Sequence, residues 1–163
     1  MDDLVIRYMA AWNGRDASAM DALVTDDVQW EDPAMPDVAI GPVAVRAFMK
    51  QSWATFPDLV FDEPDERFLL VDGDRVSWRW RMSGTFTGAP IDPPGFAPTG
   101  LTMEITGVDL WELRDGRIAV YRAFYDMNDL ARQLGIVPPP GSRPERMMAR
   151  MQRVQARAWR GRR

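Results

Sequence analysis

The stretch LTMEITGVDLWEL, residues 101–113, decides the fold, because apolar and polar side chains alternate along it. One face of the predicted strand is apolar apart from a single carboxylate: Leu101, Met103, Ile105, Gly107, Asp109, Trp111 and Leu113. The other face carries the polar side chains: Thr102, Glu104, Thr106 and Glu112. A period of two residues is typical of a β-strand with one buried face. We therefore expect a half-buried strand that places Asp109 among apolar neighbours.

The same alternation extends through the second half of the chain. Strand-like runs cover residues 58–71, 75–87, 100–113 and 117–126. Asp72-Gly73-Asp74 and Asp115-Gly116 stand between consecutive runs, and such sequences are typical of hairpin turns. A loop rich in proline and glycine, residues 88–100, separates the second run from the third. These features predict a curled antiparallel sheet.

Helices are predicted mainly before this sheet. Apolar residues recur at helical spacing over residues 2–12, Asp16 can cap a second helix that reaches about Val24, and Pro42 opens a third. A short helix, residues 127–134, follows the last strand and ends at Gly135. Helices that precede an antiparallel sheet favour an α+β fold, here as one domain over residues 1–137.

A separate first strand ends in VQWEDP, residues 28–33, where two carboxylates are adjacent. Asp32 shares a face with Val28 and Trp30, whereas Glu31 lies on the opposite face. We therefore predict that Asp32 points into the protein and Glu31 into solvent. An Asp before a proline is also common where a strand ends in a turn, so a purely structural role for Asp32 stays open.

The predicted interior is aromatic and contains two inward carboxylates. Burial raises the pKa of a carboxyl by up to about 3–5 units, so two such groups in one small domain indicate a site. Tyr8, on the apolar side of the first helix, is the third candidate catalytic residue beside Asp32 and Asp109. The side chains expected to line a substrate pocket face inward and are apolar or aromatic: Trp12, Trp30, Trp53, Trp78, Trp80, Met82, Phe86, Trp111, Tyr121 and Tyr125. The alternative is a structural Asp109 and tryptophans that form plain core or a dimer interface.

The composition excludes several kinds of chemistry. The chain has 163 residues, with no His and no Cys. Ser-His-Asp and Cys-His catalysis, His-ligated metal sites and disulfides are therefore excluded. We see no calcium-, phosphate- or dinucleotide-binding motif, so we expect neither a metal nor another cofactor. The acidic N-terminal start and the absence of a long apolar run predict a cytoplasmic protein without a membrane span.

Three segments of the first half resemble one known superfamily: RYMAAWNGRD (7–16), DDVQWEDP (26–33) and GPVAVRAF (41–48). Over residues 1–136 the chain resembles the nuclear transport factor 2-like superfamily, which includes ketosteroid isomerases, SnoaL-like polyketide cyclases and limonene epoxide hydrolase. The resemblance implies a cone of curved antiparallel sheet wrapped by helices, with a pocket inside the cone.

Within this superfamily, the ketosteroid isomerase pattern implies roles for three residues. Tyr8 matches a Tyr in an R-Y pair on the first helix. Asp32 matches the catalytic base of an E-D-P motif. Asp109 matches an acid that is kept protonated and shares the oxyanion hole with the Tyr.

Other segments are more similar to SnoaL-like proteins, among them FPDL (56–59), DGRI (115–118) and QLG (133–135). The chain departs from the cyclase pattern at two positions. Phe86 stands where a His is usual, and Ala123 stands where a pocket-facing Asp is expected. Asp126 could replace that Asp only if a bulge turned it inward.

These residues are compatible with three functions. The first is a cofactor-independent isomerase that acts through an enolate on an apolar carbonyl compound, steroid- or polyketide-like. The second is a SnoaL-like polyketide cyclase or an enzyme similar to epoxide hydrolase, whose Asp–Arg–Asp arrangement requires an inward Arg. Strand alternation places three candidate arginines outward: Arg79, Arg81 and Arg122. The third is a binding or assembly module without catalysis.

The C-terminal segment differs from the rest of the chain in charge. A stiff linker, Pro-Pro-Pro-Gly at residues 138–141, precedes a basic amphipathic helix over residues 142–163, which Ser142 and Glu145 open as a capping box. With eight Arg and one acid this segment carries +7, so the other residues carry −11 of the net charge of −4. One stripe of the helix is cationic: Arg146, Arg150, Arg153, Arg157 and Arg160. The neighbouring stripe is apolar: Met147, Met151, Val154 and Ala158. We expect the helix to dock on the acidic body of its own chain or of a homodimer partner rather than on nucleic acid.

Overall fold

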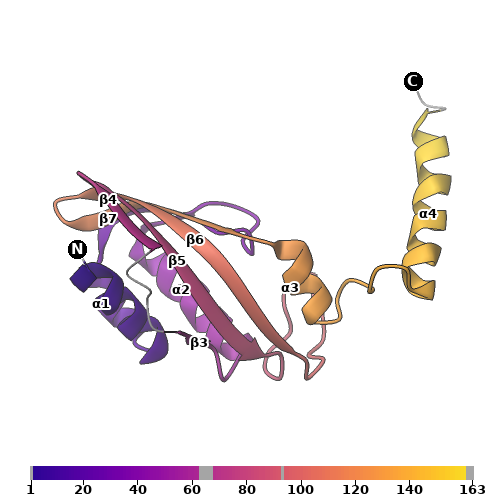
Figure 1. The fold of residues 1–163 in the computed structure, drawn as a ribbon, viewed down its shortest axis with the longest axis horizontal. Coiled ribbons are helices and arrows are strands. Elements are labelled where there is room, and N and C mark those ends of the chain that lie inside the picture. Colours follow the sequence, from indigo (N-terminus) through magenta and orange to yellow (C-terminus); the bar gives the residue numbers. More distant parts are fainter. Residues whose placement is uncertain (1, 63–67, 93, 161–163) are drawn as a thin grey trace.

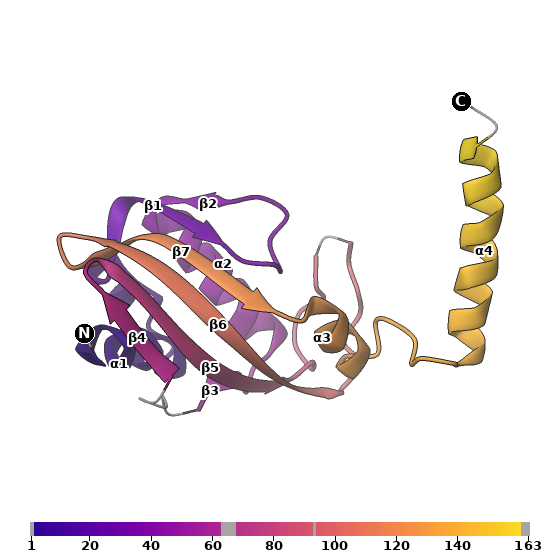
Figure 2. The same ribbon diagram turned by 45° about the horizontal axis from the view of Figure 1, so that its top comes forward.

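The computed structural model describes residues 2–62, 68–92 and 94–160 and consists of one curved sheet with helices on one side and at one end (Figures 1 and 2). In chain order the elements are α1 (Asp2–Asn13), the 3₁₀ helix η1 (Ala17–Ala22), β1 (Val24–Glu31), β2 (Ala39–Ile40), α2 (Gly41–Thr55), β3 (Val60–Phe61), β4 (Leu69–Asp72), β5 (Arg75–Thr85), β6 (Thr102–Arg114), β7 (Arg117–Tyr125), α3 (Met127–Gln133) and α4 (Arg143–Arg160).

The strands pair in the order β2-β1-β7-β6-β5-β3, and β4 pairs with β5. Helices α1 and α2 lie on one side of this sheet, and α3 lies at the end of it (Figure 1). The α+β prediction is thus confirmed. One pairing differs from the antiparallel expectation, because β1 runs parallel to β7. A parallel pair needs a long crossover, and the segment between β1 and β7 supplies one that no local pattern reveals.

Strand β6 confirms the alternation predicted for residues 101–113 except at its two ends, where Leu101 is 47% exposed and Leu113 is only partly buried. From Met103 to Trp111 every second residue is buried and the residues between them are exposed. The buried row faces an aromatic core in which the Trp30 and Tyr121 rings stack with centroids 3.6 Å apart. Asp109 lies within this row with no exposed surface, at 0%.

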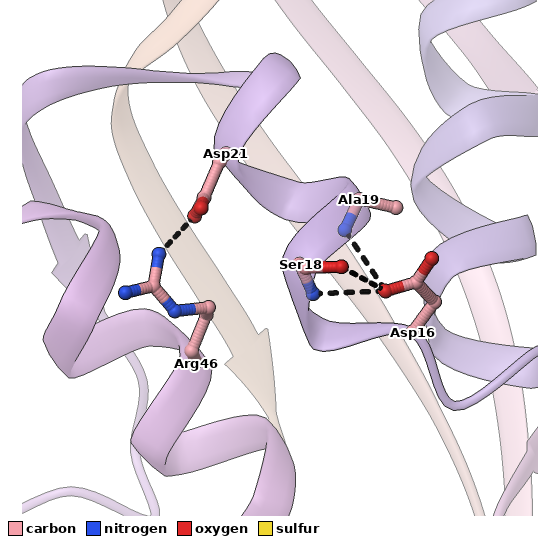
Figure 3. Close-up of polar contacts among 5 residues, drawn as sticks. All are labelled: Asp16, Ser18, Ala19, Asp21 and Arg46. Atoms are coloured by element: carbon pink, nitrogen blue, oxygen red, sulfur yellow. Dashed lines mark hydrogen bonds and ion pairs between the residues drawn. The ribbon is translucent and has the colours of Figure 1, made fainter.

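The first half differs from prediction at its second helix. Residues Ala17–Ala22 form a 3₁₀ helix, and β1 already begins at Val24. Figure 3 shows the predicted cap: the Asp16 carboxylate accepts hydrogen bonds from the backbone N–H groups of Ser18 and Ala19. An ion pair between Asp21 and Arg46 joins this short helix to α2 (Figure 3). The helix is short because the chain must leave it early to enter the sheet at Val24.

The predicted strand over residues 58–71 is only partly present. Its ends are β3 and β4, both paired with β5, whereas residues 63–67 lie outside the described residues. The two predicted hairpin turns are confirmed, with Asp115 and Gly116 both at positive φ, 53° and 73°. Two positive φ angles are the signature of the tight turn that matches strand twist.

Helix α4 projects away from the rest of the molecule (Figures 1 and 2), and it has no buried residue. The predicted capping box forms, with the Ser142 hydroxyl accepting from Glu145 N–H at 3.2 Å. The expectation that this helix docks on the body of its own chain is wrong. The proline-rich linker keeps the helix apart from that body, because proline fixes φ and makes the chain stiff. The division into domains at residue 137 stays a prediction.

Gly107 on β6 provides a test of this packing. A Cβ atom at this position would lie 2.2 Å from Cζ2 of Trp80. We expect Gly107→Ala to lower the free energy of unfolding by about 1–3 kcal/mol, because the buried indole would have to move. Thr106→Ala, on the exposed face of the same strand, should change it by less than about 0.5 kcal/mol. Urea denaturation of both variants measures the difference, and equal stabilities would contradict the packing described.

Candidate active site

An apolar cavity of about 100 Å³, the inner cavity, lies between the inner face of the sheet, α1 and α2. It adjoins a larger groove of about 570 Å³, the outer groove, bordered by α2, α3 and the loop residues Ile91, Asp92 and Phe96. The two share three large apolar residues, Phe48, Phe56 and Leu130. The outer groove therefore lies directly beside the inner cavity.

Asp32 lies at the edge of the inner cavity, directly after β1. Its carboxylate oxygen Oδ1 accepts hydrogen bonds from the Tyr125 hydroxyl at 2.7 Å and from Ala34 N–H at 2.8 Å. Burial raises the pKa of this carboxyl above its ordinary value of 3.8, while these two hydrogen bonds oppose the rise. The adjacent Glu31 turns the other way and pairs with Arg122 at 3.1 Å. The predicted separation of the two acids is confirmed.

Asp109 is held inside the sheet by its cross-strand neighbours. It stands opposite Ala123 on β7, whose small side chain leaves room for the carboxyl. The Trp80 indole lies over Gly107, its partner on β6, and donates from Nε1 to Asp109 Oδ1 at 2.6 Å. The Tyr121 hydroxyl donates to the same oxygen at 3.2 Å. The glycine thus allows the indole to reach the carboxyl.

The second oxygen of this carboxyl, Asp109 Oδ2, is buried without a hydrogen-bond partner. Burial raises the pKa of Asp109 well above 3.8, although the hydrogen bonds from Trp80 and Tyr121 lower it. Burial of a carboxylate with an unpaired oxygen costs far more free energy than burial of the neutral carboxylic acid. The environment therefore favours the protonated form of Asp109.

Tyr8 connects this buried acid to the cavity through Tyr121. The hydroxyls of Tyr8 and Tyr121 are 3.4 Å apart, and both residues line the inner cavity. Burial raises the pKa of both phenols well above 10.0, with a further rise from the negative charge of Asp109 when it is ionised. Both hydroxyls are thus neutral hydrogen-bond donors at the wall of an apolar cavity.

Seven of the predicted site residues line the inner cavity: Tyr8, Trp12, Asp32, Trp80, Met82, Tyr121 and Tyr125. The others belong to the core or stand apart from the cavity wall: Trp30, Trp53, Trp78, Phe86, Asp109 and Trp111. The inner face of the sheet extends beyond the cavity, and close ring contacts fill that part. Tyr8, for example, lies 5.1 Å from the Trp111 ring centroid.

Two of the outward arginines, Arg81 and Arg122, and the carboxylate of Asp126 have partners away from the inner cavity. Arg81 pairs with Asp62 and Glu104, and Arg122 pairs with Glu31 and Glu112, all on the outer side of the sheet. Asp126 caps α3 by accepting from the N–H groups of Asn128 and Asp129. Among the described residues, no group of three acidic side chains is arranged to hold a metal ion.

The sequence is similar to that of one known protein family. The sequence model of the SnoaL-like polyketide cyclase family matches residues 2–134. The chain belongs to this family. No protein with a curated description matches the sequence significantly.

The family fold is also found in solved structures. TsrD from Streptomyces laurentii is 27% identical, with a TM-score of 0.71 over 83% of this chain and 94% of its own. IdmH from Streptomyces antibioticus, for which a polyketide cyclase function has been suggested, is 25% identical, with a TM-score of 0.63 over 82% of this chain and 96% of its own. A protein with a ketosteroid isomerase-like fold from Catenulispora acidiphila, 19% identical, has a TM-score of 0.67 over 82% of this chain and 93% of its own, which shows the fold alone.

The sequence of this SnoaL-like protein predicts Tyr121 only as part of the pocket wall. The structure adds that its hydroxyl stands between Tyr8 and Asp109. It also adds Tyr125 as the hydrogen-bond donor to Asp32. The only signal in the sequence is the even spacing that places Tyr121 and Tyr125 on one face of the last strand, because their partners lie on other elements.

The protonation of Asp109 in this SnoaL-like protein can be tested through stability. Because the folded-state pKa is raised, ionisation of Asp109 favours the unfolded chain as the pH rises above about 4. We expect the stability of the wild type relative to Asp109→Asn to fall between pH 4 and the folded pKa, by at most about 1.4 kcal/mol per pH unit. Urea denaturation of both proteins over this range measures the trend.

Asp58→Asn is the matched control for this experiment. Hydrogen bonds from Thr85 hold the pKa of Asp58 below its ordinary value, so its stabilising contribution is complete above about pH 4. Its stability difference from the wild type should therefore stay constant at higher pH. If the Asp109→Asn difference were equally constant, Asp109 would be ionised in the folded protein.

Proposed function

We propose that this protein is a cofactor-independent acid–base enzyme that forms an enolate from an apolar carbonyl compound. Asp32 removes the proton next to the carbonyl, and Tyr8 donates a hydrogen bond to the oxygen that becomes negative. The observation that carries the proposal is one apolar cavity lined by both a half-buried carboxyl and a buried phenol. A base and a donor on opposite sides of a carbonyl group are what enolate formation requires.

The role of Asp109 in this proposal is to support Tyr8 through Tyr121. The Tyr121 hydroxyl donates to Asp109 Oδ1, so its oxygen serves only as an acceptor for Tyr8. Tyr8 can then turn its hydrogen from this long contact to the substrate oxygen. The 3.4 Å separation of the two phenol oxygens supports this, because so long a hydrogen bond holds the Tyr8 hydrogen only weakly.

The fate of the enolate distinguishes the possible reactions. Return of the proton at another carbon gives an isomerase, whereas attack on a second carbonyl of the same molecule closes a ring. Membership of the SnoaL-like polyketide cyclase family favours ring closure. Both outcomes require the same proton removal by Asp32, so one experiment tests the shared step.

Two other functions have less support. Epoxide opening by an Asp–Arg–Asp arrangement requires an arginine in the cavity, and Arg79, Arg81 and Arg122 are not among its lining residues. An assembly module with a filled interior is disfavoured because the inner cavity and the outer groove each exceed the space of one water molecule, ~30 Å³. The predicted homodimer stays a prediction.

Proton removal can be measured without knowledge of the natural substrate. Bicyclic and tricyclic aryl ketones, incubated with the enzyme in D₂O, should exchange the hydrogen next to the carbonyl for deuterium faster than in buffer. We expect Asp32→Asn to reduce this exchange by at least about a hundredfold, because the base is lost. NMR spectroscopy follows the exchange directly.

Glu31→Gln is the matched control, since it changes the adjacent carboxylate on the outer side of the sheet. Its exchange rate should stay close to that of the wild type. Exchange by Asp32→Asn at the wild-type rate would remove Asp32 from the role of base. Absence of exchange with every ketone of the series would contradict the proposed enolate chemistry.

In this proposal Tyr125 sets the pKa of the base, Asp32. Its hydroxyl donates to Asp32 at 2.7 Å and thereby lowers the pKa of that carboxyl. We expect Tyr125→Phe to move the acid limb of the pH–rate profile to higher pH, because the unsupported carboxylate holds its proton more tightly. Deuterium exchange measured from acid to neutral pH reports the shift. A rate that falls at every pH without a shift would mean that Tyr125 acts only on substrate binding.

A further inference from the structure

Helix α4 presents two uncovered faces along its 18 residues. Its arginine stripe comprises five residues, Arg146, Arg150, Arg153, Arg157 and Arg160. An apolar face lies beside it, with large side chains that are 51–67% exposed: Met147, Met148, Met151, Val154 and Trp159. At 3.6 residues per turn the apolar arc spans roughly 140° and the arginine arc roughly 80°. A partner that engages both faces would cover apolar surface and neutralise positive charge at the same time.

The rest of the described chain does not supply this partner. The salt bridges between described residues involve none of the five stripe arginines. Polar contacts of these arginines remain within the helix and its linker, as from Arg146 to the Gly141 carbonyl and from Arg160 to the Ala156 carbonyl. The helix projects beyond α3 and away from the sheet (Figure 2).

A second copy of the chain offers a poor match. Exposed apolar side chains do occur on the outer face of the sheet, among them Leu110 and Phe124. The charged residues beside them are already paired, since Arg122 binds Glu31 and Glu112 there. The outer groove is apolar, and Asp92 is the one acid among its lining residues. Neither of these two surfaces combines an apolar area with enough unpaired carboxylates to bind five arginines.

Nucleic acid would match only the arginine stripe of the helix. Phosphates would neutralise the arginines, but the apolar face with its three methionines would stay in water. A surface of anionic lipids meets both requirements, because headgroups pair with arginine while the apolar face enters the acyl boundary. Among the described helices none is long and apolar enough to cross a bilayer, so α4 would lie along the surface.

We propose that α4 is a membrane-surface helix that binds anionic lipids, with its arginines at the headgroups and the Met–Val–Trp face in the interface. The acidic body does not oppose this placement. The proline-rich linker of residues 138–141 separates α4 from the body (Figure 2). Charges that lie further apart than the Debye length of ~8 Å are largely screened at physiological ionic strength.

Cosedimentation of the full-length protein with vesicles tests the proposal. We expect binding to vesicles of phosphatidylcholine and phosphatidylglycerol in equal amounts, and little binding to pure phosphatidylcholine. The triple variant Arg150→Gln, Arg153→Gln, Arg157→Gln should bind the anionic vesicles about a hundredfold more weakly, because each arginine near the surface contributes to attraction. Met151→Gln with Val154→Gln should lower affinity about tenfold while leaving the charge unchanged.

A triple variant on the body is the matched control. Arg7→Gln, Arg75→Gln and Arg132→Gln remove the same charge from exposed positions and should leave lipid binding unchanged. Because α4 has no buried residue, none of the helix variants should change the thermal unfolding of the body. This separates lost binding from lost folding.

Three outcomes would overturn the proposal. The first is wild-type protein that stays in solution with anionic vesicles, or binds neutral vesicles equally. The second is a dimer by light scattering that the Arg150→Gln, Arg153→Gln, Arg157→Gln variant converts to monomer, without lipid binding. The third is binding to duplex DNA without binding to lipid.

Discussion

The hydrogen bond from Trp80 to Asp109 is the interaction on which the rest of the site depends. A carboxyl with no exposed surface is costly unless its neighbours satisfy it, and here they do so on one oxygen only. The arrangement requires Gly107, since any side chain there would occupy the space of the indole. It also requires Ala123 opposite, where a larger residue would displace the carboxyl. A strand glycine and a small neighbour thus become parts of the support of this buried carboxyl.

The two inward acids differ because their surroundings differ. Asp109 is enclosed by aromatic rings and favours its neutral form, whereas Asp32 lies at the cavity edge and accepts from Tyr125 and a backbone N–H. Environments that separate the properties of two carboxyls are a general means of assigning one as acid and the other as base. In this protein the aromatic core therefore determines the electrostatics of the site as well as its stability.

Much of the fold could be read from local pattern, because β6 has one buried face and its alternation also identified Asp109. The alternation of side chains along β1 likewise predicted that Asp32 and Glu31 lie on opposite faces of the strand. The contacts of these acids could not be predicted in the same way. They depend on cross-strand register, such as Trp80 opposite Gly107, and on a parallel pairing between strands that are distant in sequence. The position of α4 away from the body could not be predicted either. Charge balance alone favours docking of α4 on the acidic body, whereas the stiffness of the linker opposes it.

Cavity size limits how a substrate can be held. An apolar cavity that takes one benzene ring measures ~150 Å³, so an inner cavity of about 100 Å³ is smaller than one ring and admits only the reacting end of a polycyclic compound. The remainder must stay in the outer groove, between α2 and α3. The chain runs from α3 through the proline-rich linker into α4 (Figure 2). If α4 lies on a lipid surface, the groove is held close to the phase in which apolar carbonyl compounds concentrate. A tail without contacts to the body can then still serve the site, because it determines where the groove opens and not how the cavity is built.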